Sequence, residues 1–304
     1  MKTKTDIPYL VFLTSAIVAG LVVILMFGFI FWTAIPVFRL EGLGFIFGNN
    51  WNYNTDQYGI FIFIIGTVVM TLLTLVLAVP LGLLTAIYLS EFAPAPVEKI
   101  LRPLIELLVG IPSIVYGLFG FLFLHYYFRD TIDPFIGHML GFVPYFRNVD
   151  PSGGDNFLLA AVILTIMVIP TIIALSQDAM RAVPKEYREG SASLGATRWE
   201  TATRIVIPAA WSGIVTSIVL AMMRAMGETM AVVMVSGNSP AMPSSVLSSF
   251  YPMTAKMLND IGNYMGAPMP RSALFGIAAV LFVIEILFVI TARWISNRTK
   301  GAMK

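Results

Sequence analysis

The stretch PKEYREGSASLGATRWETATRIVIP, residues 184–208, lies between two long apolar segments at 157–177 and 209–236. It combines charged residues, small residues and signals for two helix boundaries in a chain that is otherwise apolar. Of the 304 residues 58% are hydrophobic and 12% are charged, whereas soluble domains carry about 25% charged residues. The contrast indicates a membrane protein with one ordered polar loop that a partner grips.

Six apolar segments are long enough to cross a bilayer as helices, which takes about 20 residues each. A membrane barrel would instead show segments of about ten residues that alternate apolar and polar. The first segment is too long for the apolar part of a signal peptide, so we expect an uncleaved helix. The sequence predicts an all-α membrane protein with a single transmembrane domain over 1–304 and spans near 9–35, 60–90, 104–128, 157–177, 209–236 and 273–292.

Lysine and arginine are distributed unequally between the two sides of this topology. Basic loops favour the cytoplasm, and an inside N-terminus puts most of these residues there. The inside set is Lys2, Lys4, Lys99, Arg102, Arg181, Lys185, Arg188, Arg198, Arg204, Arg293, Arg298, Lys300 and Lys304, and the outside set is Arg39, Arg129, Arg147, Lys256 and Arg271. We therefore expect both termini and the 184–208 stretch in the cytoplasm. The net charge of +2 follows from this topology and gives no indication of nucleic acid as a partner.

The 184–208 stretch divides into two short helices. Pro184 suits the first position of a helix, where its missing N–H is not needed. Gly195 suits the stop, because glycine enters the left-handed conformation at low cost. Thr197 and Glu200 have the spacing of a capping box, which begins a second helix. We expect helix, turn, helix and then the next span.

Small side chains fill the end of the first of these helices. Little side-chain bulk is present at Gly190, Ser191, Ala192, Ser193 and Ala196, so a partner could approach the backbone closely, while charged residues such as Glu189 set the register. The alternative is an amphipathic hairpin that rests on the lipid surface. Small residues would bury little apolar area in lipid, so we favour a docking element that covers about 178–208 with its flanks.

Several chemistries are missing from the sequence. It has no cysteine, which excludes disulfides and thiolate metal sites. No GxxxxGKS or GxxxxGKT sequence is present to hold the phosphates of ATP. We interpret His125 and His138, the two histidines, as interfacial or loop residues, with a metal pair as the alternative. We expect no cofactor and no enzymatic activity, so that any energy enters from a separate subunit.

Three charged residues within the fifth and sixth predicted spans need an explanation. Arg224 and Glu228 are four residues apart, so on a continuous helix they share a face and can touch. A guanidinium offers paired donors to an oxyanion and stays charged. We interpret this pair as part of an anion pathway, and the alternative is a mutually neutralising structural pair. For Glu285 we favour a structural or interface role.

Glu228 is compatible with an anion pathway if the anion carries a proton. At neutral pH phosphate does, and a carboxylate can accept a hydrogen bond from it, whereas sulfate offers none. A buried acceptor that only one of two anions satisfies discriminates between them. The sequence hypothesis is therefore selection of phosphate over sulfate.

The third predicted span contains residues that weaken a helix. Pro112 removes one backbone donor, and Gly110 and Gly117 thin the helix, so we expect a bend. The bend either serves as a hinge beside a pathway or allows close helix packing, and the sequence leaves both open.

Four segments resemble a known family when they are taken together. They are LAVPLGLLTAIYLSEF (77–92), IELLVGIPSIVYGLFG (105–120), EGSASLGATRWETATRIVIP (189–208) and RAMGETMAVVMVSGN (224–238). The chain resembles the PstC-type permeases of phosphate-specific ABC importers from about residue 60 to the C-terminus, with a core permease region of about 60–295. The third segment is similar to the signature loop of ABC importer permeases in general, and the second and fourth are more specific.

The resemblance implies six membrane helices in the inner or plasma membrane of a bacterium or archaeon. It implies a heterodimer with a PstA-type permease, two ATP-binding subunits, an extracytoplasmic phosphate-binding protein and phosphate as the substrate. It also implies that Arg224 and Glu228 matter for phosphate passage. The 184–208 stretch, through Glu189, Gly190, Ser191, Ala192 and Gly195, would couple the chain to the ATP-binding subunit.

Other functions remain open at this stage. The nearest is a permease for sulfate, molybdate or another oxyanion, and competition among anions distinguishes it. An export permease or channel would work without an external binding protein. A membrane sensor or scaffold in phosphate signalling would use the docking loop without transport, and a membrane enzyme is least favoured.

Overall fold

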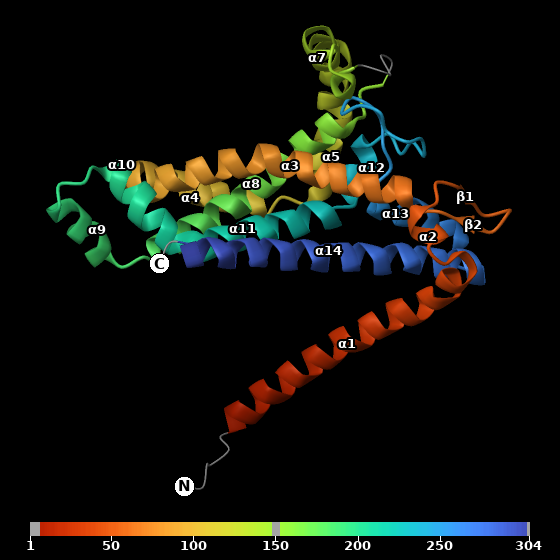
Figure 1. Cartoon of the computed structure of the whole chain (residues 1–304), viewed down its shortest axis with the longest axis horizontal. Helices are drawn as coiled ribbons and strands as arrows, with labels where there is room; N and C mark the ends of the chain where they lie inside the picture. The colour runs from red at the N-terminus through yellow and green to blue at the C-terminus, as the bar shows by residue number, and fades with distance from the viewer. Residues whose placement is uncertain (1–6, 148–152, 303–304) are drawn as a thin grey trace. The chain divides into compact units, whose positions relative to one another are not determined.

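The computed structural model describes residues 7–147 and 153–302, so Lys2, Lys4 and Lys304 lie outside the described residues. Helices form nearly all of this part of the chain (Figure 1). The long ones are α1 Ile7–Glu41, α3 Phe61–Ile87, α4 Ala95–Val109, α8 Phe157–Arg181, α11 Ile207–Gly227, α13 Met253–Tyr264 and α14 Pro268–Ala302. The shorter ones are α2 Gly44–Phe47, α5 Ser113–Phe119, α6 His125–Tyr127, α7 Asp133–Leu140, α9 Lys185–Ser193, α10 Arg198–Thr201 and α12 Met230–Val235.

Five single-turn segments and one small hairpin complete the described chain. The π-helical turns are η1 Tyr88–Phe92, η2 Gly120–Leu124, η3 Phe128–Ile132 and η5 Ala202–Val206, and η4 Pro144–Phe146 is a 3₁₀ turn. Strands β1 Trp51–Asn52 and β2 Gln57–Tyr58 pair antiparallel, with Trp51 opposite Tyr58.

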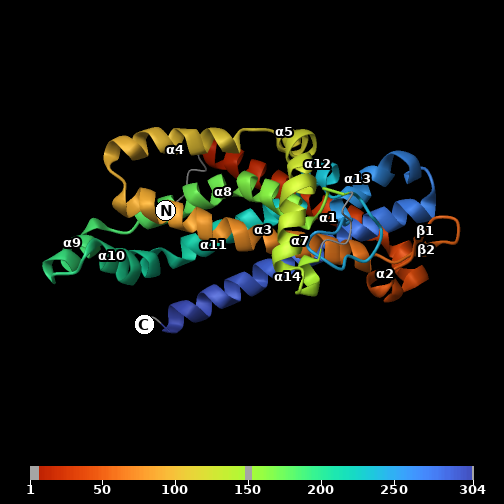
Figure 2. The same cartoon turned by 90° about the horizontal axis from the view of Figure 1, so that it is seen from above.

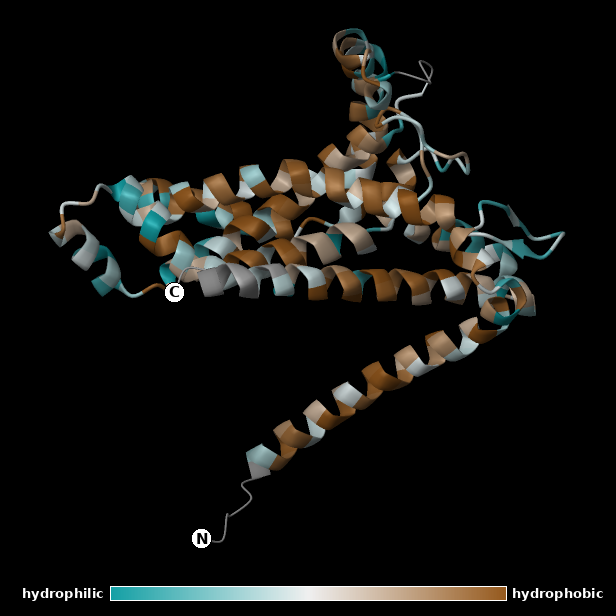
Figure 3. Cartoon of the chain, in the orientation of Figure 1, coloured by the Kyte–Doolittle hydropathy of each residue, from teal (hydrophilic) through white to brown (hydrophobic). Residues whose placement is uncertain are grey.

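Within the described ranges five helices are long and apolar enough to cross a membrane, and one bent pair can make a sixth. The five are Pro8–Glu41, Phe61–Phe92, Phe157–Arg181, Arg198–Gly227 and Pro268–Trp294. Hydrophobic residues dominate these helices, whereas α9 and the segments that join the spans are more hydrophilic (Figure 3). The all-α membrane fold expected from the sequence is confirmed.

The chain divides into two compact units, Met1–Phe61 with Asn259–Phe282, and Ile62–Leu258 with Val283–Lys304. In the larger unit α8 lies at the centre, because 61% of its apolar window is buried, a larger share than in any other single-helix span of the described chain. Figures 1 and 2 place α3, α8 and α11 side by side, and their apolar residues share one core with those of α12. The Asn156 side chain caps α8 by accepting a hydrogen bond from the Leu159 N–H at 2.9 Å.

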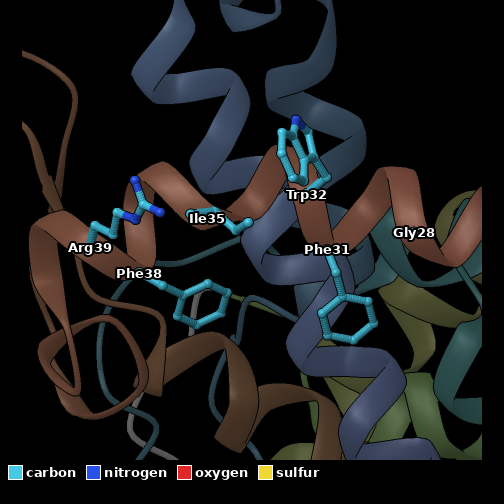
Figure 4. Close-up of a pocket in the computed structure, with 6 residues that line it drawn as sticks. All are labelled: Gly28, Phe31, Trp32, Ile35, Phe38 and Arg39. Carbon is cyan, nitrogen blue, oxygen red and sulfur yellow. The ribbon is translucent and has the colours of Figure 1, made fainter.

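In the smaller unit α1 packs along the first half of α14. Phe27 meets Phe282 with ring centroids 4.0 Å apart, and Ser272 Oγ lies 3.0 Å from the Val37 N–H. Much of α1 remains exposed and apolar. A shallow pocket of about 460 Å³ follows this helix past Phe31 and Trp32 to Arg39 (Figure 4). Phe38 and Arg39 lie in the last turn of α1, and aromatic and basic residues are typical of helix ends at the membrane surface.

The third predicted span, 104–128, corresponds to a bent pair of helices rather than to one helix. Helix α4 ends at Val109 and the helical run from Ser113 to Leu140 begins at an angle of 91° to it. Residues 104–109 therefore belong to α4, which lies against α8. The bend that Gly110 and Pro112 predict is confirmed, since Pro112 occupies the N-cap of α5 with an extended ψ of 138°.

The fifth predicted span is also interrupted. Helix α11 ends at Gly227, and α12 begins at Met230 after Glu228 and Thr229. Glu228 has a ψ of 130°, which is extended rather than helical. The expectation that Arg224 and Glu228 share one helix face is therefore wrong, because no continuous helix joins them.

Gly117 lies where α5 and α12 pack closely against each other. A Cβ at Gly117 would lie 2.8 Å from the Ala231 Cα and 3.0 Å from the Met234 Sδ. A Cβ at Gly110 would meet only the Leu107 carbonyl oxygen, at 3.4 Å. Gly117 therefore serves close packing, and Gly110 has room for a methyl group.

We expect Gly117→Ala to destabilise the chain by about 1–3 kcal/mol, because a backbone atom must move to admit the new methyl group. Gly110→Ala is the matched control and should leave stability nearly unchanged. Thermal unfolding in detergent, followed by size-exclusion chromatography after heating, measures both. Equal midpoints for the two variants would contradict the packing role of Gly117.

Candidate functional site

The polar stretch folds as the sequence predicts. Helix α9 starts after Pro184, which occupies the N-cap, one position earlier than expected. Gly195 has a φ of +82° and makes the turn, a conformation that glycine adopts with little strain. The Thr197 side chain accepts a hydrogen bond from the Glu200 N–H, and the Glu200 carboxylate accepts one from the Thr197 N–H at 2.9 Å. The capping box is confirmed.

Four of the five predicted docking positions on this hairpin carry small side chains or none, namely Gly190, Ser191, Ala192 and Gly195. A Cβ at Gly190 would meet nothing within 4 Å, and Glu189 and Ala192 are exposed. Apolar residues that the sequence analysis did not single out flank them, since Leu194 is 89% exposed and Trp199 is 59% exposed. Small residues beside exposed apolar ones form a surface suited to a protein partner.

The inner side of α9 is fixed to the membrane helices by Arg188. Its Nε and Nη2 donate to the two carboxylate oxygens of Glu91 at 3.0 and 2.8 Å. Its Nη1 and Nη2 also donate to the carbonyls of Val183 and Met180, both at 2.8 Å. The hydrogen bond to Glu91 raises the pKa of Arg188 above its usual value, so this guanidinium stays charged.

A pocket of about 340 Å³ lies beside this contact, lined by Ser90, Arg181, Lys185, Arg188 and Glu189. Arg181 forms an ion pair with Glu98 on α4, and Arg102 pairs with Asp178 at 3.0 Å. The end of α8 is thus tied by ion pairs to α4.

Inside the membrane region Arg224 lies beside α8. Its Nη1 donates to the Thr171 Oγ1 at 3.3 Å. Thr171 follows Pro170, which interrupts the hydrogen-bond ladder of α8. No ion pair joins Arg224 to Glu228 among the described residues, so the structural-pair alternative finds no support here.

Glu228 instead supports the interruption between α11 and α12. Its Oε1 accepts a hydrogen bond from the Ala231 N–H at 3.2 Å, and its own carbonyl accepts one from Thr254 Oγ1 at 2.9 Å. The position of a Cβ at Gly227 is 3.9 Å from Glu285 Oε1. Glu285 therefore comes close to the interruption, a proximity that the sequence did not predict.

The second interruption lies close to the first. Tyr116 on α5 donates a hydrogen bond to the Leu108 carbonyl at 3.0 Å across the α4–α5 bend, and α5 packs on α12 at Gly117. Interrupted membrane helices commonly form the substrate sites of transporters. The chain brings Arg224, Glu228 and two helix breaks into one region of the bundle.

His125 on α6 contacts a carboxylate 30 residues further along the chain. Its Nδ1 lies 2.8 Å from Asp155 Oδ1, so the described contacts give it a structural role. His125 begins α6 and His138 lies in α7, so the loop expectation is wrong for both, and their position at the membrane surface stays a prediction.

A protein-family model matches residues 78–301 of the chain and carries the description "Binding-protein-dependent transport system inner membrane component". The chain belongs to this family. It is therefore a multi-pass permease component of the inner membrane, as the resemblance implied, and the ABC importer permease fold is confirmed.

Curated relatives cover most of the chain. A probable ABC transporter permease, YqgH of Bacillus subtilis, is 37% identical over 84% of this chain and 78% of its own. The phosphate transport system permease PstC of Mesorhizobium japonicum is 34% identical over 88% and 81%. PstC of Haemophilus influenzae is 34% identical over 95% and 93%.

Two solved structures share the fold at 16% identity. One is an inward-facing MetNI methionine ABC transporter, with a TM-score of 0.51 over 79% of this chain and 93% of that chain. The other is a bacterial ABC transporter involved in alginate import, with a TM-score of 0.54 over 94% and 98%.

We expect Thr197→Ala to loosen the start of α10, because the Glu200 N–H loses its acceptor. Amide exchange at residues 200–202 should be about fivefold less protected than in the native chain. Thr203→Ala is the matched control, since Thr203 Oγ1 donates to the Trp199 carbonyl and caps no helix start.

The Thr197→Ala measurement decides whether the capping box holds the start of α10. Unchanged protection in Thr197→Ala would show that the box does not hold α10.

Proposed function

We propose that this chain forms the phosphate pathway of an ATP-driven importer, together with a PstA-type partner permease. The observation that carries the proposal is the position of Arg224 near two interrupted helices, with Thr171 at 3.3 Å as its hydrogen-bond partner. A neutral partner leaves the guanidinium charge available to an anion. The names of the PstC relatives support phosphate as that anion.

Arg224 supplies attraction and Glu228 supplies selection in this proposal. The guanidinium donates paired hydrogen bonds to two oxygens of one phosphate. The Glu228 Oε1 accepts from the Ala231 N–H, and its second oxygen is available to the proton that phosphate retains at neutral pH. Sulfate has no such proton and would leave this acceptor unsatisfied.

The proposed coupling element is the segment 178–208, with both termini on the same cytoplasmic side. Glu189, Gly190, Ser191, Ala192 and Gly195 would contact one of two ATP-binding subunits. The exposed small residues of α9 and the empty space at Gly190 support this. An extracytoplasmic phosphate-binding protein would deliver the substrate, and the chain itself would need no cofactor.

The bend at Gly110 and Pro112 is proposed as the hinge of the pathway. The 91° change of direction lets α4 follow the docking side while α5 stays packed on α12. Gly117 would contribute close packing rather than bending. We treat residues 1–304 as one permease domain with its core at about 60–295.

We expect Arg224→Gln to reduce ATP-dependent phosphate uptake by about 10- to 100-fold, the range for losing a hydrogen bond to a charged group. The complete complex, reconstituted in liposomes with the binding protein, takes up radiolabelled phosphate in this assay. Thr171→Val is the matched control, because it removes the neutral partner and keeps the charge. Normal uptake by an assembled Arg224→Gln complex would make Arg224 structural, and native uptake of sulfate or molybdate in place of phosphate would overturn the substrate.

We expect Glu228→Gln to weaken discrimination between phosphate and sulfate by about tenfold or more. Glutamine keeps an oxygen that accepts from the Ala231 N–H, so the helix start is retained while the carboxylate is lost. Sulfate competition against phosphate uptake measures the effect. Unchanged competition would remove Glu228 from substrate selection.

A further inference from the structure

We propose that the Glu91–Arg188 ion pair makes α9 and the cytoplasmic end of α3 one rigid piece, so that movement imposed on α9 enters the membrane bundle through α3. This inference rests on the proposed docking function of α9. It assigns a positioning role to two residues that are 97 positions apart in the chain.

The geometry of the pair restrains α9 in position and direction. Arg188 contacts both oxygens of Glu91, at 3.0 and 2.8 Å. A planar guanidinium that meets a carboxylate in this paired way allows little rotation between the two groups. Two further bonds reach the carbonyls of Val183 and Met180, so one side chain ties α9 to α3 and to the end of α8.

Burial makes this pair costly to break. The Glu91 side chain is 9% exposed and that of Arg188 is 25% exposed. Removing either partner leaves a charge in a site with little water, which is strongly unfavourable. Other ion pairs near this end are more open, because the partners Arg102 and Asp178 are 35% and 54% exposed.

The end of α3 is shaped to present Glu91. The helix continues into the π-helical turn η1, and the wider turn is an unusual local geometry that often marks functional positions. Ser90 Oγ donates to Glu91 Oε1 at 2.8 Å, and this hydrogen bond orients the carboxylate toward Arg188. Its Oε1 thus accepts from Ser90 and Arg188, and its Oε2 accepts from Arg188.

Two weaker contacts also link α9 and η1 to α10. Ser191 Oγ lies 2.9 Å from Thr201 Oγ1, and Phe92 meets Trp199 with ring centroids 6.2 Å apart. The apolar cluster beneath them includes Leu89, Met180 and Val206. The inner side of α9 is thus anchored, while Gly190 and Ala192 on the hairpin remain exposed for a partner.

Distance measurements between spin labels test this rigidity directly. The chain has no cysteine, so labels at Ser193→Cys on α9 and Tyr88→Cys on η1 have no background from this subunit. In the complete complex we expect a narrow distance distribution that is the same without nucleotide and with trapped ATP. A second pair, Ser193→Cys with Val283→Cys on α14, should change its distance on ATP binding.

Glu91→Gln should broaden the first distribution and make its mean depend on ATP. Arg188→Lys, which keeps the charge without the paired donors, should do the same. The double variant Glu91→Gln with Arg188→Gln should broaden the first distribution no more than either single variant, because all three remove the same ion pair. Arg102→Gln is the matched control and should leave the first distribution narrow, because Arg102 contacts Glu106 and Asp178 and not α9.

The coupling ratio supplies a second readout. We expect Glu91→Gln to lower the number of anions carried per ATP by about tenfold while ATP hydrolysis continues at a similar rate. A variant that merely assembled poorly would lose both activities together. Arg102→Gln should keep the native ratio.

A native first distance that changes with ATP, a second distance that does not, or native behaviour of Glu91→Gln would each overturn the inference. The label distances do not depend on which anion is carried, so a wrong substrate leaves this test intact. If the chain bound no ATP-hydrolysing partner, the proposed function would fail. The width of the nucleotide-free distance distribution in the native and Glu91→Gln chains would still show whether the Glu91–Arg188 ion pair holds α9 rigidly against α3.

Discussion

Backbone N–H and C=O groups inside a bilayer have no water to bond with, and this constraint governs the structure around the helix breaks. A spanning segment is therefore helical unless protein groups replace the missing bonds. Each break here has such replacements. The Glu228 carboxylate accepts from the Ala231 N–H and Thr254 donates to the Glu228 carbonyl, while Tyr116 donates to the Leu108 carbonyl.

These replacements give one residue two tasks. Glu228 satisfies a backbone donor at the start of α12, and it also brings a charge to the region of Arg224. A charged group in a membrane costs at least about 2.5 kcal/mol at a helix centre, and a hydrogen bond to the backbone offsets part of that cost. The Glu228 carboxylate thus supplies the acceptor that the Ala231 N–H needs at the helix break, and the same hydrogen bond lowers the cost of placing its charge there.

Local patterns were predicted well from the sequence, and long-range contacts were not. The Thr197–Glu200 box and the Gly195 turn depend on residues within a few positions of each other, so their spacing was sufficient. The bend at Pro112 was predicted for the same reason. Near Gly227 the sequence permits a bend, because Gly227 and Thr229 both allow one, but the contact of the Glu228 carboxylate with the Ala231 N–H was not predicted.

The contact between Glu91 and Arg188 is the clearest case of a contact that the sequence did not predict. Glu91 lies at the end of a predicted span and Arg188 within the polar stretch, and many other charged residues could have paired with either. Only the packing of α3 against α8 brings them together. The same holds for Thr171 beside Arg224 and for Glu285 near Gly227, which lie on different helices.

The two regions of the molecule are joined by stiff elements. Thr171 and Arg181 are on α8, about 15 Å apart at 1.5 Å per residue. Helix α11 runs from the π-helical turn beside α10 to Arg224. Helix α8 and the helical run η5–α11 therefore lead from the two ends of the 184–208 stretch to the region of Arg224.

The space around Gly190 bears on why this position holds a glycine. The chain itself leaves space for a side chain at this position, so its own folding does not require glycine there. Under the proposed docking function, the surface of the ATP-binding subunit would be what requires a small residue there. In the history of such an assembly, Gly190 would change together with residues of another polypeptide rather than with its own core.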